Sequence, residues 1–396
     1  MRIALIPELF HPYVYGGVER RYYEIAKRLA KRHEVHVFAI GPRDRPTQEI
    51  VDGIIVHRVL RFPKEALYED GSTRRLGPPI LYAASLLKKL FCKYRFDVVD
   101  CSIFPYLHIF PSRALASIWR APLVLTVHEV WGDYWRSYAN NWCVAMVGMI
   151  VERLSFELPH CFVCVSGVTA RNLVRYLGQK AVGRVFIVPN GVSLEYAKAR
   201  GVQRFLEKAK RQVKEIVFAG RLIEHKRVDV LLEAFSRLYN RNPNLRLKII
   251  GDGPLREPLR KLAKNLGVLD AVEFLGELPH DEFLRVVADS YVFAFPSVRE
   301  GFAISVMEAM SVGTPPIVVS HRNNGALDYV RNGVNGLVVE PNNPEALAEG
   351  IAYLIEGVGA EEYARICKSC LQTAMSYSWE RVVELLERIY RFVISC

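Results

Sequence analysis

The sequence predicts two α/β domains, each built on a doubly wound parallel sheet, that face each other across a cleft. Short runs rich in Val, Ile and Leu alternate with longer amphipathic stretches, a pattern typical of parallel strands and their covering helices. The alternation stops at about residues 191–213, where charge rises, and then starts again. The chain has 396 residues, whereas single cores usually stop growing at about 250–300 residues.

The first half begins with a strand, a glycine loop and a helix, predicted at Ile3–Pro7, Gly16-Gly17 and Glu19–Lys31. Further strands are predicted at residues 35–40, 54–59, 97–101, 123–127, 161–165 and 185–188. Further helices are predicted at residues 80–94, 111–119, 142–158 and 168–177, with an irregular loop at about 61–79.

In the second half of the chain, the apolar pattern predicts strands at residues 215–219, 246–250, 271–274, 291–295, 316–319 and 336–339, with helices between them. The last segment, Trp379–Ile394, is an amphipathic helix. We therefore expect one domain at residues 1–190, a second at 191–378, and a last helix at 379–396 that crosses back to the first.

The composition is that of a soluble globular enzyme, with 51% hydrophobic and 24% charged residues. No signal peptide is recognisable at Met1, and the longest apolar run, Trp142–Val151, has ten residues, too few to span a bilayer. We expect a cytoplasmic protein that attaches peripherally, if at all, to the inner face of a membrane.

The positive charge is concentrated in the first half of the chain. Residues 1–190 carry 26 Lys+Arg against 16 Asp+Glu, a net +10, whereas residues 191–396 carry 27 against 26, a net +1. Lys88 and Lys89 stand beside Leu86, Leu87, Leu90 and Phe91, a combination that suits an anionic membrane. A solvated basic face explains the charge equally well. Nucleic acid is not expected, because no nucleic-acid motif accompanies the charge.

Eight cysteines are present, and two pairs, Cys161/Cys164 and Cys367/Cys370, have C-x-x-C spacing. The first pair lies in a predicted strand, where positions three apart face opposite sides. Neither pair has a partner pair at the spacing of a zinc site. We expect buried or free thiols, no metal site and no cofactor.

Two carboxylates stand eight residues apart in the stretch Glu300–Ala309. The apolar pattern predicts a helix that begins near Gly301 or Phe302, with Glu300 in the loop before it and Glu308 about two turns inside. A helix N-terminus suits a phosphate, and a carboxylate accepts hydrogen bonds from paired sugar hydroxyls. The pattern therefore favours a nucleotide-sugar site, although two solvated glutamates on an amphipathic helix would look the same.

Other candidates also follow predicted strands, so they meet at the carboxyl edges of the sheets. Gly16 and Gly17 allow backbone N–H groups to approach an anion closely. Arg221 and Lys226 can stabilise negative charge on a departing diphosphate without a metal, and no D-x-D pair occurs in the chain. His128 can donate to a sugar hydroxyl, in an undecided protonation state. Each of these residues has an alternative interpretation. In that interpretation, the two glycines form an ordinary turn, the two basic residues lie on the surface, and the histidine has its hydrogen bonds satisfied within the protein.

Taken in order, these motifs resemble the retaining glycosyltransferases of family 4, which have the GT-B fold of two Rossmann-like domains. The matching stretches cover nearly the whole chain and lie at residues 15–19, 188–192, 220–226, 251–254, 274–276, 296–297, 300–309 and 313–315.

The resemblance implies a role for each candidate residue. Arg221 and Lys226 would bind the donor diphosphate, Glu308 the ribose, and Glu300 the sugar hydroxyls. The remaining assignments place Phe302, Ala303 and Ile304 beside the sugar, Leu278 in the base pocket, Gly16 and Gly17 over the diphosphate, and His128 near the transferred sugar. Departures from the pattern occur at Ala303 and Arg227, where glycine is common, at Ser193, where aspartate is common, and at residues 321–325, where a glycine-rich turn is usual.

The resulting expectation is a metal-independent, retaining hexosyltransferase that uses a UDP- or GDP-type sugar. Its acceptor would be a hydroxyl group on a glycolipid, polysaccharide or glycan precursor of the cell envelope. The alternatives are a nucleotide-sugar epimerase, a sugar phosphorylase, or a binding protein with a decayed site.

Overall fold

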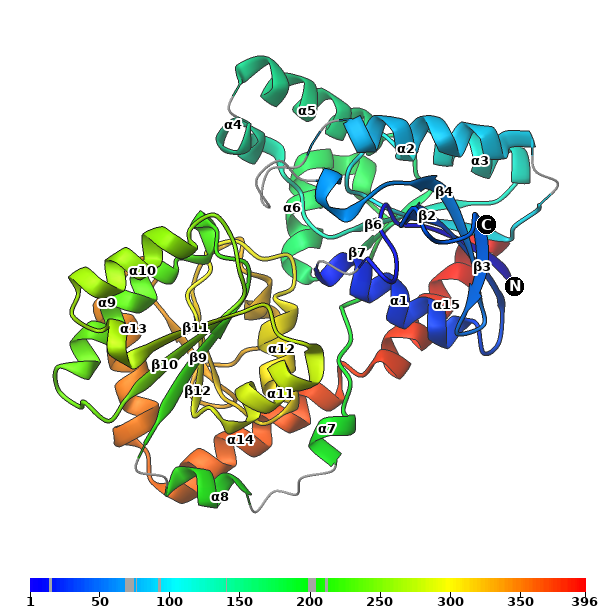
Figure 1. Cartoon of the computed structure of the whole chain (residues 1–396). Helices are drawn as coiled ribbons and strands as arrows, with labels where there is room; N and C mark the ends of the chain where they lie inside the picture. Colours follow the sequence, from blue (N-terminus) through cyan, green and yellow to red (C-terminus); the bar gives the residue numbers. More distant parts are fainter. Residues whose placement is uncertain are drawn as a thin grey trace. The chain divides into compact units, whose positions relative to one another are not determined.

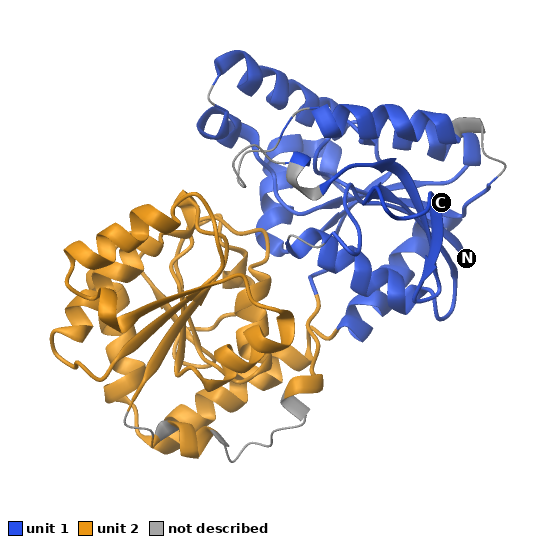
Figure 2. Cartoon of the chain, viewed as in Figure 1, with its two compact units in different colours: residues 1–190, 379–396 blue, residues 191–378 orange. Residues whose placement is uncertain are grey.

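The structure is a computed structural model that describes residues 1–13, 16–67, 75, 77–91, 94–139, 141–198, 204–210 and 213–396. It divides into two compact units (Figure 2). Unit 1 contains residues 1–190 and 379–396, and unit 2 contains residues 191–378.

Unit 1 contains an eight-stranded sheet with the order β3-β4-β2-β1-β5-β6-β7-β8 (Figure 1). The strands are β1 Arg2–Ile6, β2 Glu34–Gly41, β3 Gln48–Val51, β4 Ile54–Arg61, β5 Val98–Ser102, β6 Leu123–Val127, β7 Cys161–Cys164 and β8 Val185–Ile187. Every pair is parallel except β3–β4, an antiparallel hairpin closed by Asp52-Gly53 with φ of 50° and 80°. This Asp-Gly turn is a hairpin signal that could have predicted β3, which we did not expect.

The helices of unit 1 are α1 Gly17–Leu29, α2 Gly77–Leu87, α3 Ile109–Trp119, α4 Trp135–Tyr138, α5 Trp142–Ser155, α6 Gly167–Leu177 and α15 Trp379–Ser395. Short 3₁₀ turns lie at Lys64–Leu67, Lys88–Phe91, Gly132–Tyr134 and Gly178–Ala181. The steps from β4 to β5 and on to β8 all run the same way across the sheet, so right-handed crossovers place α2, α3, α5 and α6 on one face. The step from β1 to β2 runs the other way, and α1 covers the opposite face together with α15 (Figure 1).

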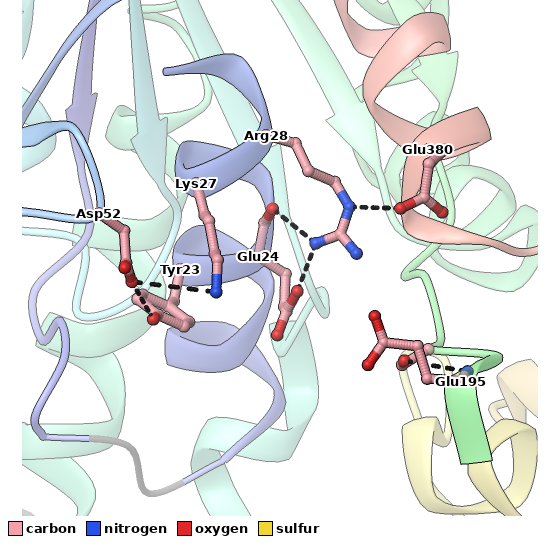
Figure 3. Close-up of polar contacts among 8 residues, drawn as sticks. Tyr23, Glu24, Lys27, Arg28, Asp52, Glu195 and Glu380 are labelled. Carbon is pink, nitrogen blue, oxygen red and sulfur yellow. Dashed lines mark hydrogen bonds and ion pairs between the residues drawn. The ribbon is translucent and has the colours of Figure 1, made fainter. Parts of the chain in front are cut away.

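The last helix is held to unit 1 by polar contacts. The Tyr390 hydroxyl donates to Asp100 Oδ2 at 2.5 Å, and Arg28 Nε lies 2.9 Å from Glu380 Oε1 (Figure 3). Asp100 also accepts from Tyr22 and Thr126, and burial raises the pKa of its carboxyl. The hydrogen bonds to Asp100 are buried, so they fix the position of α15 on the sheet.

Unit 2 contains a six-stranded, all-parallel sheet with the order β11-β10-β9-β12-β13-β14. The strands are β9 Glu215–Ala219, β10 Arg246–Ile250, β11 Val272–Gly276, β12 Val292–Phe295, β13 Pro316–Val319 and β14 Leu337–Val339. The helices are α7 Glu195–Lys198, α8 Arg204–Ala209, α9 Val228–Tyr239, α10 Arg256–Asn265, α11 His280–Asp289, α12 Ile304–Ser311, α13 Pro344–Ala352 and α14 Ala360–Met375. Further turns of 3₁₀ helix lie at Glu224–Lys226, Leu269–Ala271 and Gly325–Asp328, and Tyr353–Gly357 is a π-helix.

The predicted α/β class with two parallel sheets is confirmed, and β6, β9, β10 and β13 have the predicted bounds. The helix predicted at 80–94 is wrong in its bounds, because α2 begins at Gly77, ends at Leu87 and continues as a 3₁₀ turn. Within the predicted loop, residues 68–74 and 76 lie outside the described residues. Among the helices that the structure describes, none is long and apolar enough to cross a membrane.

Candidate functional site

The candidate residues of unit 2 follow its two central strands. The strand order reverses between β9 and β12, because the chain proceeds from β9 outward to β11 and then returns to pair β12 with β9. In open α/β sheets, ligands bind outside the carboxyl ends of the strands at such a reversal. Arg221 and Lys226 follow β9, and Glu300 follows β12, so the fold brings their loops to this point.

Lys226 and Glu300 form an ion pair, between the Nζ and Oε1 atoms. The two side chains are only 14% and 10% exposed, so the pair is largely screened from water. The ammonium group also lies 5.1 Å from the centroid of the Phe295 ring. The carboxylate therefore holds the ammonium group in place at the strand ends.

Backbone hydrogen bonds fix the loops that carry these side chains. Val298 N and Ser297 Oγ donate to His225 O at 3.0 and 3.2 Å, which ties the loop after β12 to the loop after β9. Glu300 N donates to Asn323 O at 2.8 Å, and Gly325 N donates to Glu300 O at 2.9 Å. Three loops are thus joined around the ion pair.

Basic side chains gather around His225. Burial, followed by the nearby cations Lys226, Arg299 and Arg221, lowers the pKa of the His225 imidazole to about 3. The imidazole is therefore neutral at physiological pH, and the positive charge of the site comes from the three cations. Arg299 was not selected from the sequence, although its position directly before Glu300 is a signal that could have found it.

Two glycines of the turn after β10 pack directly on the loop that carries Arg221. A Cβ on Gly251 would lie 2.1 Å from Gly220 O, and a Cβ on Gly253 would lie 2.6 Å from Leu222 O. Their φ values of +117° and +157° are also unfavourable for residues with side chains. The predicted tight turn therefore packs against the loop that carries Arg221 and supports it.

The predicted start of the helix after Glu300 is wrong by two to three residues. The helix α12 begins at Ile304, because Ala303 adopts the left-handed conformation with φ 59° and cannot continue it. The Tyr329 hydroxyl lies 2.8 Å from both Phe302 O and Ala303 O and donates to them. Glu308 is consequently just over one turn inside the helix, rather than two.

Glu308 is nearly buried, with 5% of the residue exposed, and its Oε1 lies 3.9 Å from His280 Nδ1 at the start of α11. Leu278 is half-buried in the loop that leads into α11. Burial raises the pKa of Tyr329, and Glu300 and Glu308 both add to this rise. Both carboxylates therefore lie within electrostatic range of one side chain.

The remaining candidates belong to unit 1. Gly16 has an extended backbone, and a Cβ there would lie 3.6 Å from Glu19 Oε2, so nothing among the described residues of unit 1 requires a glycine. Tyr15 of the same motif lies outside the described residues. Gly17 is the first residue of α1.

His128 follows β6, two strands from β1 in the sheet. Burial, followed by the nearby Arg21 cation, lowers the pKa of His128 to about 3, so the imidazole is neutral. Its Nε2 is shielded from solvent and has no hydrogen-bond partner among the described residues. A shielded, unpartnered imidazole nitrogen is costly unless a ligand or water satisfies it.

Comparisons with known proteins place the chain among glycosyltransferases. A model of the glycosyl transferases group 1 matches residues 200–369, and a model of Glycosyltransferase Family 4 matches residues 15–196. The D-inositol 3-phosphate glycosyltransferase of Corynebacterium glutamicum is 31% identical over 397 residues, which cover 96% of this chain and 92% of that protein.

Two solved structures share the fold of the whole chain. Sucrose-phosphate synthase from Thermosynechococcus elongatus has a TM-score of 0.79 at 19% identity, covering 100% of this chain and 99% of that one. Anabaena Alr3699/HepE in complex with UDP-glucose has a TM-score of 0.72 at 17% identity, covering 99% and 100%.

Proposed function

The chain belongs to the group 1 glycosyltransferases of family 4 and has their GT-B fold, and from this premise we propose a metal-independent transfer with retention of configuration. The proposed donor is a nucleotide-diphosphate sugar of the UDP or GDP type. The proposed acceptor is a hydroxyl group on a lipid-linked or polysaccharide glycan of the cell envelope. The hexosyltransferase class itself follows from the family.

The enclosed Lys226–Glu300 pair, with Arg221 and Arg299 nearby, is the observation that carries the proposal. It combines concentrated positive charge with a sugar-binding carboxylate at the strand ends where ligands of such sheets bind. The Alr3699/HepE complex with UDP-glucose supports a donor of the UDP type within the same fold.

In the proposed reaction, Lys226 and Arg221 neutralise the charge that builds on the departing diphosphate. Glu300 accepts hydrogen bonds from the donor sugar, and Glu308 accepts them from the ribose. The neutral His128 can donate or accept a hydrogen bond at the transferred sugar, with its charge unchanged near pH 7.

Retention is proposed to follow front-face attack, in which the leaving phosphate takes the proton of the acceptor hydroxyl. No protein nucleophile is then needed. The roles of Gly16, Gly17 and Leu278 stay predictions from the family resemblance.

Family membership favours transfer over the epimerase and phosphorylase alternatives. The test is to incubate the protein with UDP- and GDP-sugars and candidate hydroxyl acceptors, and to identify the products by mass spectrometry. We expect nucleoside diphosphate and a glycoside to appear together, only when an acceptor is present. Formation of a second nucleotide sugar would identify an epimerase, and a sugar phosphate formed from inorganic phosphate would identify a phosphorylase.

Within this assay, Glu308→Gln is expected to raise the donor KM about tenfold or more, because a charged hydrogen bond to ribose contributes about 1.5–3 kcal/mol. The control is Glu349→Gln, an exposed position in the second half of α13. An unchanged donor KM in Glu308→Gln would contradict the ribose assignment.

A further inference from the structure

The helix α5 is oriented in an unusual way for a surface helix. Its buried positions are small or polar, namely Ala145, Gly148, Glu152 and Ser155. Five large apolar side chains of α5 are exposed to solvent, and we call this set the α5 face: Trp142, Val144, Val147, Ile150 and Leu154. Trp142 is 72% exposed, Val147 60% and Ile150 52%. Contiguous exposed apolar surface of this kind marks an interaction site.

The inward side of α5 has specific reasons for its small and polar residues. A Cβ on Gly148 would lie 2.5 Å from the Trp135 ring, so only glycine allows α4 to pack there. Glu152 accepts hydrogen bonds from Trp131 N and Gly132 N at 2.8 Å each, and from Trp135 Nε1 and Tyr106 OH at 3.1 Å each. The helix is therefore locked in its orientation and cannot turn its apolar side inward.

Other elements extend the apolar surface on the same side of the sheet. On α2, Ile80, Leu81 and Leu87 are exposed, and on α3, Phe110 and Ile118 are exposed. The crossover rule places α2, α3 and α5 on one face of the sheet, as Figure 1 shows.

A cluster of aromatic side chains packs against the inward side of α5 through Trp135. The Trp131 ring lies 4.7 Å from the rings of Trp135 and Tyr138, and 5.4 Å from Tyr134. All four residues lie in or beside the turn and short helix that precede α5. Trp142 at the start of α5 is, by contrast, exposed, and Trp is enriched where protein meets the headgroup region of a bilayer, because one part of its ring system is apolar and another is polar.

The charge of this side is mainly positive, although Asp133 before α4 and Glu157 after α5 are exposed acids. Within α2, α3 and α5 the only carboxylate is Glu152, which is buried. The basic residues Arg113 and Arg153 lie on α3 and α5, and Lys88 and Lys89 directly follow α2. A second copy of the chain docked symmetrically here would bring more basic than acidic side chains together. Anionic lipid headgroups complement both the basic residues and the apolar ones.

We propose that the α5 face docks on an anionic lipid bilayer, with α5 lying in the plane of the interface and Trp142 at headgroup level. This location differs from the one expected from the sequence, because Leu86 is buried and unable to reach lipid. Of the other expected contacts, Leu87 is exposed, whereas the side chains of Leu90 and Phe91 lie outside the described residues. The proposal does not depend on the reaction that the protein catalyses.

The test is co-flotation of the full chain with vesicles of phosphatidylcholine alone or with phosphatidylglycerol, at low and high salt. We expect binding that requires phosphatidylglycerol, weakens with salt and falls at least tenfold in Val147→Glu/Ile150→Glu. The matched control is Leu385→Glu, an exposed apolar position on α15 that covers the opposite face of the sheet. Its binding is expected to equal that of the wild type.

A second readout uses tryptophan fluorescence. Vesicles with phosphatidylglycerol are expected to shift the emission to shorter wavelength, and Trp142→Phe is expected to remove most of that shift. Absence of wild-type binding to these vesicles, or equal binding by Val147→Glu/Ile150→Glu, would overturn the proposal. So would a wild-type dimer in light scattering that becomes monomeric in Val147→Glu/Ile150→Glu, since a second copy would then cover the face.

Discussion

Replacing Lys226 with alanine is expected to lower kcat/KM about 30- to 1,000-fold, which corresponds to a loss of about 2–4 kcal/mol of transition-state stabilisation. The ammonium group is enclosed, and its partner Glu300 holds it in place. Without it, charge on the leaving diphosphate is less well neutralised, so kcat should fall more than donor affinity. Steady-state kinetics of the transfer reaction with the preferred donor measure both.

A second variant distinguishes two roles for Lys226, which are neutralising the Glu300 carboxylate and acting directly on the leaving diphosphate. If Lys226 only neutralised Glu300, then Lys226→Ala/Glu300→Gln would recover activity, because no unpaired carboxylate would remain. The proposed role predicts that the double variant stays at least as impaired as Lys226→Ala. The control is Lys264→Ala in the last turn of α10, an exposed lysine that should leave kcat/KM unchanged. Turnover of Lys226→Ala within twofold of the wild type would remove Lys226 from the reaction.

The second large effect is expected from Gly251→Ala, which should destabilise unit 2 by about 3 kcal/mol or more. The new Cβ would lie 2.1 Å from Gly220 O, and neither backbone segment can move without disturbing the Arg221 loop. For a unit of this size we expect its unfolding temperature to fall by about 6–12 °C. Bound donor should also stabilise the variant less than it stabilises the wild type.

The matched control for this variant is Gly267→Ala. Gly267 also has a positive φ, +71°, but a Cβ added there would have no neighbouring atom within 4 Å. Its cost should be about 1–2 kcal/mol, from backbone strain alone. Calorimetry of both variants tests the difference, and equal unfolding temperatures would show that the close approach of Gly251 to Gly220 is unimportant.

Much of the fold was predictable because buried parallel strands are continuous apolar runs. β9 and β13 appear at the predicted residues for this reason, because only Glu215, at the start of β9, is charged. β3 was not predicted, because Gln48–Val51 is a short and half-polar edge strand whose only signal is the Asp-Gly turn after it. The π-helix at Tyr353–Gly357 likewise leaves no periodic signal.

In the candidate site, too, the sequence located residues but did not show their contacts. Lys226 and Glu300 were selectable because both follow apolar strands, yet only the folded structure shows that they form a pair. The start of α12 was misplaced because apolar spacing does not reveal that Ala303 has a positive φ. Ala303 and Arg227, which depart from glycine in the resemblance to family 4, both have left-handed backbones, with φ of 59° and 51°. A glycine would adopt these conformations without strain.

Other contacts of the site depend on tertiary structure and leave no local signal. Tyr329 reaches back to the carbonyl groups of Phe302 and Ala303, and His225 O accepts from two residues of the loop after β12. Such long-range hydrogen bonds cannot be inferred from spacing along the chain. They decide the shape of the loops, whereas the strand pattern decides only where the loops begin.

The most direct test of the central claim is a thermal-shift panel of UDP-, GDP- and ADP-sugars, each measured with and without EDTA. A donor at about 100 times its Kd stabilises the folded protein by about 2.7 kcal/mol. We predict that UDP- or GDP-sugars raise the unfolding temperature, that EDTA leaves this rise unchanged, and that Lys226→Ala diminishes it. A shift that EDTA abolishes, or no shift with any of the nucleotide sugars, would contradict a metal-independent donor site.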